Sequence, residues 1–163
     1  MTPEQITLMG KVREVVEKNP GRHDQSTYIG AGVDKDGDCI PIGYEGLDVE
    51  ELRNYALLPI PEVSEKDSNI CKTTGCVAGW ASALAAPKGS KLNDMGVLLP
   101  GKRSYNSISY SAYGQEALGI SDGVATWLFA PSRSREEILW ALEWLPTHDA
   151  GTWAEIESAS YEA

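Results

Sequence analysis

The segment that most constrains the fold is residues 71–87, which read CKTTGCVAGWASALAAP. Small side chains recur at every fourth position, at Gly75, Gly79 and Ala83, and they would leave a smooth groove along one face of a helix. Glycine inside a helix costs roughly 1 kcal/mol relative to alanine, so Gly79 requires a packing reason. We therefore predict that these residues are structural and that a second backbone approaches this face closely.

Larger apolar side chains define a second face of the same segment. Val77, Trp80 and Leu84 are three or four residues apart, which is the spacing of a helix that packs against a core. A threonine, Thr73 or Thr74, is the expected cap of this helix. The proline that ends the segment is the expected stop, because proline cannot continue a helix. Together these features predict a central packing helix that includes Trp80.

Helical patterns recur outside this segment. Thr2 and Gln5 form a capping box, with Pro3 at the first helical position. Apolar residues then follow at helical spacing up to about Lys18: Ile6, Met9, Val12, Val15 and Val16. Caps followed by apolar spacing predict further helices at about residues 48–56, 109–119, 121–131, 134–146 and 153–160.

A period of two replaces the helical period over residues 28–42, and it predicts a β-hairpin. An aspartate and a glycine at residues 36–37 are typical of a tight two-residue turn. This turn would place Val33 opposite Ile40 and would put the apolar residues on one face. The predicted fold class is mainly α (α+β), a small helical bundle with an inserted β-hairpin. The hairpin and the acidic helix after it look like an insertion over about residues 28–68.

The composition is that of one globular domain over residues 1–163. The chain is 42% hydrophobic and 23% charged, which are ordinary values for a folded domain. No apolar run of eighteen residues occurs that could cross a membrane. The first twenty residues carry acidic side chains rather than the basic start and apolar stretch of an export signal. We therefore expect a cytoplasmic protein that does not interact with membranes.

The formal net charge of −10 constrains the partners. Direct binding to nucleic acid is not expected, because it requires lysine and arginine to release counterions from phosphates. One acidic group lies in the predicted acidic helix and the loop after it: Glu50, Glu51, Glu62, Glu65 and Asp67. Another lies near the end of the chain: Asp149, Glu155, Glu157 and Glu162. Such surfaces either keep a protein soluble or imitate a phosphate backbone and occupy the basic site of a nucleic-acid-binding protein.

Two cysteines, Cys71 and Cys76, are candidates for a zinc site. Zinc ribbons and fingers require a second ligand pair at matching spacing, whereas the chain offers only the distant His23 and His148. A cysteine enzyme is an alternative, in which Cys76 at a helix N-terminus has a lowered pKa and His23 or His148 acts as base. The interpretation that we favour is a buried cysteine that packs as a small apolar side chain.

A calcium loop is the second candidate metal site. Asp34, Asp36, Asp38 and Glu45 occupy the oxygen-ligand positions of a twelve-residue calcium loop. Cys39 stands at the sixth place, where such a loop requires glycine for its sharp turn. The predicted hairpin turn explains these carboxylates better, as a solvated turn, so we expect neither a metal nor another cofactor.

The segment Cys71–Ala81, together with Ala117–Ile120 and Trp127–Phe129, resembles small, mostly uncharacterised proteins of actinobacterial bacteriophages and their hosts. The resemblance covers residues 69–145 most clearly. It implies a phage-encoded protein that acts inside a bacterial host cell, and it supplies no catalytic residue.

Three functional hypotheses follow. The first is a binding protein, not an enzyme, that interacts with and inhibits a host or phage macromolecule, through an acidic surface that imitates nucleic acid. The second is a small cysteine-dependent enzyme that uses Cys76. The third is a calcium- or zinc-binding domain. The oligomeric state is not predicted by the sequence.

Overall fold

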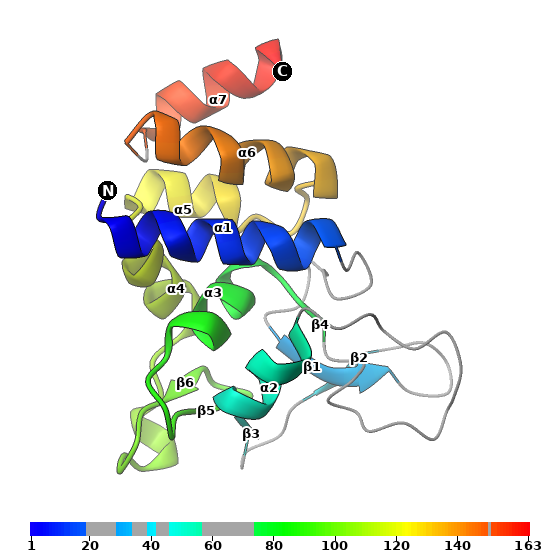
Figure 1. Cartoon of the computed structure of the whole chain (residues 1–163), viewed down its shortest axis with the longest axis vertical. Helices are drawn as coiled ribbons and strands as arrows, with labels where there is room; N and C mark the ends of the chain where they lie inside the picture. Colours follow the sequence, from blue (N-terminus) through cyan, green and yellow to red (C-terminus); the bar gives the residue numbers. More distant parts are fainter. Residues whose placement is uncertain (19–28, 34–38, 42–45, 57–73, 150) are drawn as a thin grey trace.

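The computed structural model of the chain confirms a mainly helical fold with small antiparallel sheets (Figure 1). It describes residues 1–18, 29–33, 39–41, 46–56, 74–149 and 151–163. The helices are α1 (Pro3–Lys18), α2 (Val49–Ala56), α3 (Val77–Ala85), α4 (Tyr110–Leu118), α5 (Asp122–Leu128), α6 (Arg135–Thr147) and α7 (Trp153–Glu162). The strands are β1 (Ile29–Val33), β2 (Cys39–Pro41), β3 (Leu47–Asp48), β4 (Thr74–Gly75), β5 (Lys91–Leu92) and β6 (Val97–Leu98), in two sheets ordered β2-β1-β4 and β3-β5-β6.

The helices are stacked, with α7 at one end of the molecule (Figure 1). Helix α6 packs against both α7 and α1, and α1 packs in turn on α3 and α4. Helix α5 contacts α4 and α7. The strands and α2 lie toward the other end, where α2 packs on α3. Helix α3 therefore contacts α1, α2 and α4, as a central packing helix must.

Helix α1 begins with the predicted capping box. The Thr2 backbone N–H donates to Gln5 Oε1 (2.8 Å), and the Gln5 N–H donates to Thr2 Oγ1 (3.2 Å). The buried residues of the helix are Leu8, Met9, Val12, Val15 and Val16. The prediction was wrong for Ile6, which is 43% exposed. At about 100° per residue, Ile6 points roughly 120° away from Val12 at the centre of the buried stripe.

The interior of α3 confirms the helix that the small residues predict. Residues 77–83 are all buried, and Trp80 is fully enclosed by the core. Leu84 is only partly buried and belongs to the edge of the core. The helix ends at Ala85, ahead of the proline that was expected to stop it.

The predicted start of α3 was wrong. Neither threonine caps it; the cap is Cys76, whose Sγ accepts a hydrogen bond from the Gly79 backbone N–H (3.5 Å). Thr74 and Gly75 instead form strand β4 and pair with β1 in an antiparallel ladder. Because Thr74 and Gly75 are extended, α3 begins only at Val77. Gly75 therefore does not lie on the helical face with Gly79 and Ala83 that the sequence predicts.

Helices α3 and α4 approach each other closely through small residues. A Cβ built on Gly114 of α4 would lie 3.0 Å from the Ala78 carbonyl oxygen and 3.1 Å from Ala78 Cα. One turn further along α3, the Ser82 hydroxyl donates to the Ala78 carbonyl (2.8 Å). A backbone approach of the predicted kind therefore exists, and it runs through Ala78, which the sequence pattern does not single out.

Strands β1 and β2 confirm the hairpin but not its register. Val33 pairs with Cys39 rather than with Ile40, and Gly30 pairs with Pro41. Three steps along β1 therefore match two steps along β2, so β1 carries a β-bulge with one extra residue. The predicted register was wrong because strict alternation allows no such residue, whereas a glycine-rich strand accommodates it.

The acidic helix begins as predicted, because Asp48 Oδ1 accepts a hydrogen bond from the Glu50 backbone N–H (2.9 Å). Val49 and Leu52 are buried in the same core as the other helices. Arg53 extends from α2 to the end of α3, where its guanidinium donates to the Ala83 and Ala86 carbonyls. Helix α2 is thus part of the bundle, and its origin as an insertion stays a prediction.

The second sheet was not predicted, and a buried asparagine organises it. Asn93 Oδ1 accepts hydrogen bonds from the Met95 and Gly96 backbone N–H groups (2.9 and 3.0 Å), and Asn93 Nδ2 donates to Ser107 Oγ (3.0 Å). The Tyr110 hydroxyl donates to the Asn93 carbonyl (2.5 Å). These bonds close the turn between β5 and β6 and attach it to α4.

The later helices begin at serine caps, as predicted. Ser109, Ser121 and Ser134 each accept a hydrogen bond from a backbone N–H in the first turn of α4, α5 and α6. The prediction that Pro146 ends α6 was wrong, because the helix runs to Thr147. Proline has no backbone N–H, so Pro146 removes one hydrogen bond from the last turn of α6. The helix tolerates this loss because it ends one residue later.

A row of aromatic rings runs along α6. Trp127 of α5 meets Trp140 edge to face at a centroid separation of 6.0 Å, and Trp140 stacks on Trp144 at 5.8 Å. His148 stacks on Trp144 at 4.0 Å. The last three members are four residues apart, so they lie along one face of the helix.

Candidate binding surfaces

The cysteine and histidine candidates occupy different environments. Cys76 is 2% exposed, as the favoured interpretation of a buried cysteine expects, and it also caps α3, which was not predicted. His148 is exposed at the end of α6, with its ring on Trp144 and its Nδ1 2.9 Å from the Trp144 carbonyl oxygen. Cys71 and His23 lie outside the described residues. The cysteine-enzyme hypothesis therefore stays a prediction. The thiol that it requires, that of Cys76, is buried in the structure.

The metal and acidic-surface candidates fall mostly outside the described residues. These are the calcium-loop residues Asp34, Asp36, Asp38 and Glu45 and the acidic residues Glu62, Glu65 and Asp67. Within the described ranges, no group of three or more His, Cys, Asp or Glu side chains is placed to hold a metal ion. Glu51 lies in α2, and Glu50 is half-buried. In the described part of the chain, no helix is both long enough and apolar enough to cross a bilayer.

A groove of about 760 Å³ lies where α1, α3 and α4 meet. Its apolar lining consists of Pro3, Leu8, Leu84, Ala85, Leu99, Ile108 and Ala117, and its polar lining of Glu4, Thr7, Lys11, Tyr113 and Glu116. Burial raises the pKa of the Tyr113 phenol, as expected for a ring set into an apolar wall. Lys11 opposes Glu4 and Glu116 in sign, so the groove has an apolar lining and charges of both signs.

Sequence reasoning missed this groove for a physical reason. Its residues come from three helices and two loop positions that are far apart in the chain. Thr7 and Lys11 share one face of α1 by helical spacing, but an exposed polar face is the normal state of a surface helix. Only the packing of α1 on α3 and α4 turns this face into one wall of a groove.

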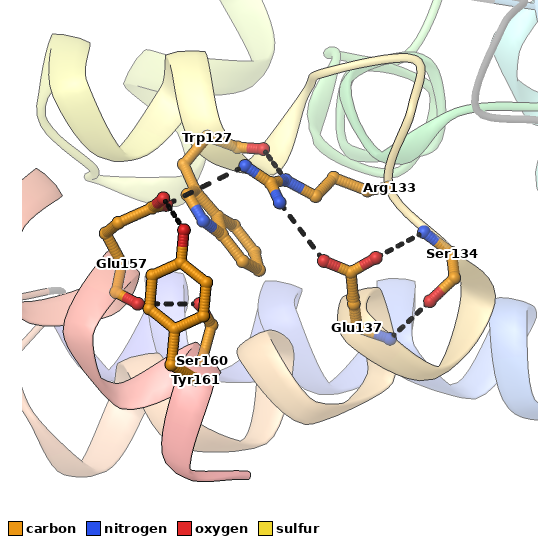
Figure 2. A network of polar contacts seen from close by, with 7 residues as sticks. All are labelled: Trp127, Arg133, Ser134, Glu137, Glu157, Ser160 and Tyr161. Atoms are coloured by element: carbon orange, nitrogen blue, oxygen red, sulfur yellow. Dashed lines mark hydrogen bonds and ion pairs between the residues drawn. The ribbon is translucent and has the colours of Figure 1, made fainter.

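A second feature is a polar network centred on Arg133, between α5, α6 and α7 (Figure 2). The Arg133 guanidinium lies 4.0 Å from the centroid of the Trp127 ring, and its Nε donates to the Trp127 carbonyl (3.0 Å). A terminal nitrogen donates to Glu137 Oε2 (3.1 Å), and the other lies 3.9 Å from Glu157 Oε2. Glu157 Oε1 accepts a hydrogen bond from the Tyr161 hydroxyl (2.9 Å). Arg133 thus connects the three helices.

Glu137 gives this network a testable pH dependence. The hydrogen bond from the Ser134 backbone N–H to Glu137 Oε1 (3.1 Å) lowers the pKa of the Glu137 carboxyl, and Arg133 lowers it further. A carboxyl with a lowered pKa stabilises the fold above its ordinary pKa of 4.5, and this stabilisation is lost as the pH falls through the folded-state value. We expect Glu137→Gln to flatten the acid side of the stability curve.

The measurement is the free energy of unfolding in urea, taken from about pH 7 to about pH 3. The difference between the wild-type protein and Glu137→Gln should shrink as the pH falls. Glu136→Gln removes a neighbouring exposed charge and is the control. Equal acid dependence of the wild-type protein and Glu137→Gln would contradict the assignment.

The outer side of α7 forms the third feature. A shallow pocket of about 490 Å³ is lined by residues of this helix alone: Trp153, Ala154, Glu157, Ser158 and Tyr161. We call these five residues the α7 face. Trp153 is 39% exposed and Tyr161 80% exposed, whereas Ile156 is fully buried in the core.

Comparison of the chain with protein-family models, with curated proteins and with solved structures gave no match. The functional interpretation therefore depends on the geometry of the groove, the Arg133 network and the α7 face. The resemblance to actinobacteriophage proteins stays a prediction from the sequence.

Proposed function

We propose that this chain is a binding protein that holds an amphipathic segment of a partner protein in the groove between α1, α3 and α4. The observation that carries the proposal is the groove itself. Its volume of about 760 Å³ is that of a ligand pocket of ordinary size, and such pockets often lie between the helices of a bundle.

The lining of the groove favours a peptide segment with one apolar and one polar side. Ile108 is 36% exposed and Leu84 is partly buried, so both offer apolar surface that a partner would remove from water. Lys11, Glu4 and Glu116 would pair with polar groups of the partner and fix its orientation. The resemblance to phage proteins supports a partner from a bacterial host cell, whose activity the bound protein would block.

The test uses a bulky substitution that fills the groove without changing the core. Thr7 is exposed and lines the groove, so Thr7→Trp should occlude it and leave α1 folded. The matched control is Ile6→Trp, because Ile6 is exposed on the same helix and does not line the groove. Circular dichroism establishes that both variants are folded.

Tagged wild-type protein, Thr7→Trp and Ile6→Trp are each incubated with actinobacterial lysate, and the retained proteins are identified by mass spectrometry. We expect one partner to be retained by the wild-type protein and by Ile6→Trp and to be reduced at least about ten-fold by Thr7→Trp, a loss of about 1.4 kcal/mol. Equal retention by Thr7→Trp, or no retained protein in any sample, would contradict the proposal.

A further inference from the structure

The charge of the last part of the chain is strongly one-sided. Residues 131–163 contain seven acidic and two basic residues, and α7 contains no lysine or arginine. Both arginines are turned inward. Arg133 is stacked on Trp127, and Arg135 donates to the Val16 and Glu17 carbonyls (3.1 and 2.8 Å). Arg133 forms ion pairs with Glu137 and Glu157, and the N-terminal amine pairs with Asp149. Glu155 and Glu162 of α7 are exposed and form no ion pair with any residue that the structure describes, so these two carboxylates give the helix its free negative charge.

The α7 face adds exposed aromatic rings to this acidic surface. Trp153, Glu157 and Tyr161 are four residues apart, so they follow one another along the helix. Trp153 is backed by α5, where a Cβ added to Gly123 would come within 2.8 Å of Trp153 Cβ. Tyr161 is held by its hydrogen bond to Glu157 (Figure 2). Two rings are thus presented to solvent, and these contacts restrict their motion, which lowers the entropic cost of binding a partner.

Arginine is the side chain that best fits this combination. Its planar guanidinium stacks on aromatic rings and is attracted to carboxylates, whereas lysine offers a compact charge that stacks less well. The protein already contains such an arrangement. Arg133 stacks on Trp127, pairs with Glu137 and lies 3.9 Å from Glu157 of α7 (Figure 2).

We propose that the α7 face docks an arginine-rich segment of a partner protein. Guanidinium groups of the segment stack on Tyr161 and Trp153, and the surrounding carboxylates, including Glu155 and Glu162, attract the segment over longer range. Glu157 is a positioning residue, because it holds the Tyr161 ring. This inference goes beyond the proposed function, since α7 does not line the groove.

The probe is a fluorescein-labelled octa-arginine peptide, with octa-lysine as the equally charged comparison, and binding is followed by fluorescence anisotropy. We expect octa-arginine to bind more tightly than octa-lysine. Tyr161→Leu should weaken octa-arginine binding about two- to five-fold, the range expected for losing one cation–π contact at an exposed ring. Tyr161→Phe keeps the ring but loses the hydrogen bond to Glu157, so it should bind octa-arginine more tightly than Tyr161→Leu and less tightly than the wild-type protein.

Tyr105→Leu is the matched control, because Tyr105 is also a largely exposed tyrosine (65%) and lies in the 3-10 helix Ser104–Asn106. It should bind octa-arginine as the wild-type protein does. If Tyr161→Leu and Tyr105→Leu bind equally well, the peptide is held by net charge alone and the proposal is wrong.

Two further measurements locate the peptide. The indole N–H signal of Trp153, assigned by its loss in Trp153→Phe, should shift in the NMR spectrum when octa-arginine is added. Thr7→Trp should leave the peptide affinity unchanged. An unshifted Trp153 signal, or weakening by Thr7→Trp alone, would overturn the α7 proposal and leave the groove proposal to its own test. A wild-type dimer that Tyr161→Leu dissociates would also overturn it, because a second copy would then cover the face.

Discussion

Gly114→Leu is expected to unfold the domain, whereas the same replacement at Gly10 should leave it folded. Both glycines lie inside helices, so the change in helix propensity is the same and favours leucine by roughly 1 kcal/mol. Their surroundings differ. A Cβ on Gly114 would press on the Ala78 backbone at 3.0 Å, whereas a Cβ on Gly10 would meet nothing within 4 Å.

The contact at Gly114 cannot relax easily, because the atoms that it meets belong to the backbone of another packed helix. Gly114→Ala should already cost about 1–3 kcal/mol by forcing α3 and α4 apart, and leucine adds bulk with no space to receive it. Gly10→Ala should instead stabilise the protein by about 0.5–1 kcal/mol. Urea unfolding followed by circular dichroism measures all four variants. A Gly114→Leu protein with wild-type stability would contradict the packing described for α3 and α4.

Gly96→Ala is expected to cost about 3–5 kcal/mol, through backbone strain and a steric clash together. Gly96 has a φ angle of 145°, in the region that favours glycine. A Cβ there would lie 2.0 Å from the Ile108 carbonyl oxygen, which accepts a hydrogen bond from the Val97 backbone N–H (2.7 Å). The substitution therefore separates β6 from the segment that leads into α4.

Gly101→Ala distinguishes the two contributions. Gly101 also has a positive φ angle, 75°, but a Cβ there would meet nothing within 4 Å. Its alanine variant should lose only the strain energy, about 1–2 kcal/mol. Thermal unfolding of both variants measures the difference, and equal losses at Gly96 and Gly101 would show that the Ile108 contact is unimportant.

The helices could be predicted from the sequence because their signals are local. A serine cap and apolar residues at helical spacing lie within a few residues of each other, so Ser109, Ser121 and Ser134 identify three helix starts without tertiary information. The start of α3 failed for the opposite reason. Pairing of Thr74 with β1 depends on a strand far away in the chain, and this pairing overrides the capping preference of threonine.

The hairpin register and the second sheet show the same limit. The bulge in β1 changes which residues of β1 and β2 pair, but it does not alter the alternation of apolar and polar residues in the sequence. Strands β5 and β6 have two residues each, too few for such an alternation to be recognised. The β5–β6 turn depends on Asn93, whose partners include Ser107 and Tyr110. A buried asparagine cannot be told from an exposed one in a single sequence.

The candidate sites were less predictable than the fold. The groove arises from three helices that meet, and none of its residues carries a chemical signature in the sequence. The acidic end of the chain was visible as a charge pattern. Which carboxylates are paired, as Glu157 is with Arg133, and which face solvent, as Glu155 and Glu162 do, required the structure.

The aromatic row on α6 also supplies an optical signal. Indole rings separated by about 6 Å couple their electronic transitions, so Trp127, Trp140 and Trp144 should produce an exciton feature in the circular dichroism spectrum. The Trp127–Trp140 contribution requires α5 and α6 to stay docked, because the two rings belong to different helices, whereas the Trp140–Trp144 contribution belongs to α6 alone. Loss of the Trp127 contribution, measured against Trp127→Phe, would therefore report separation of these two helices even where helical content is unchanged, without any added label.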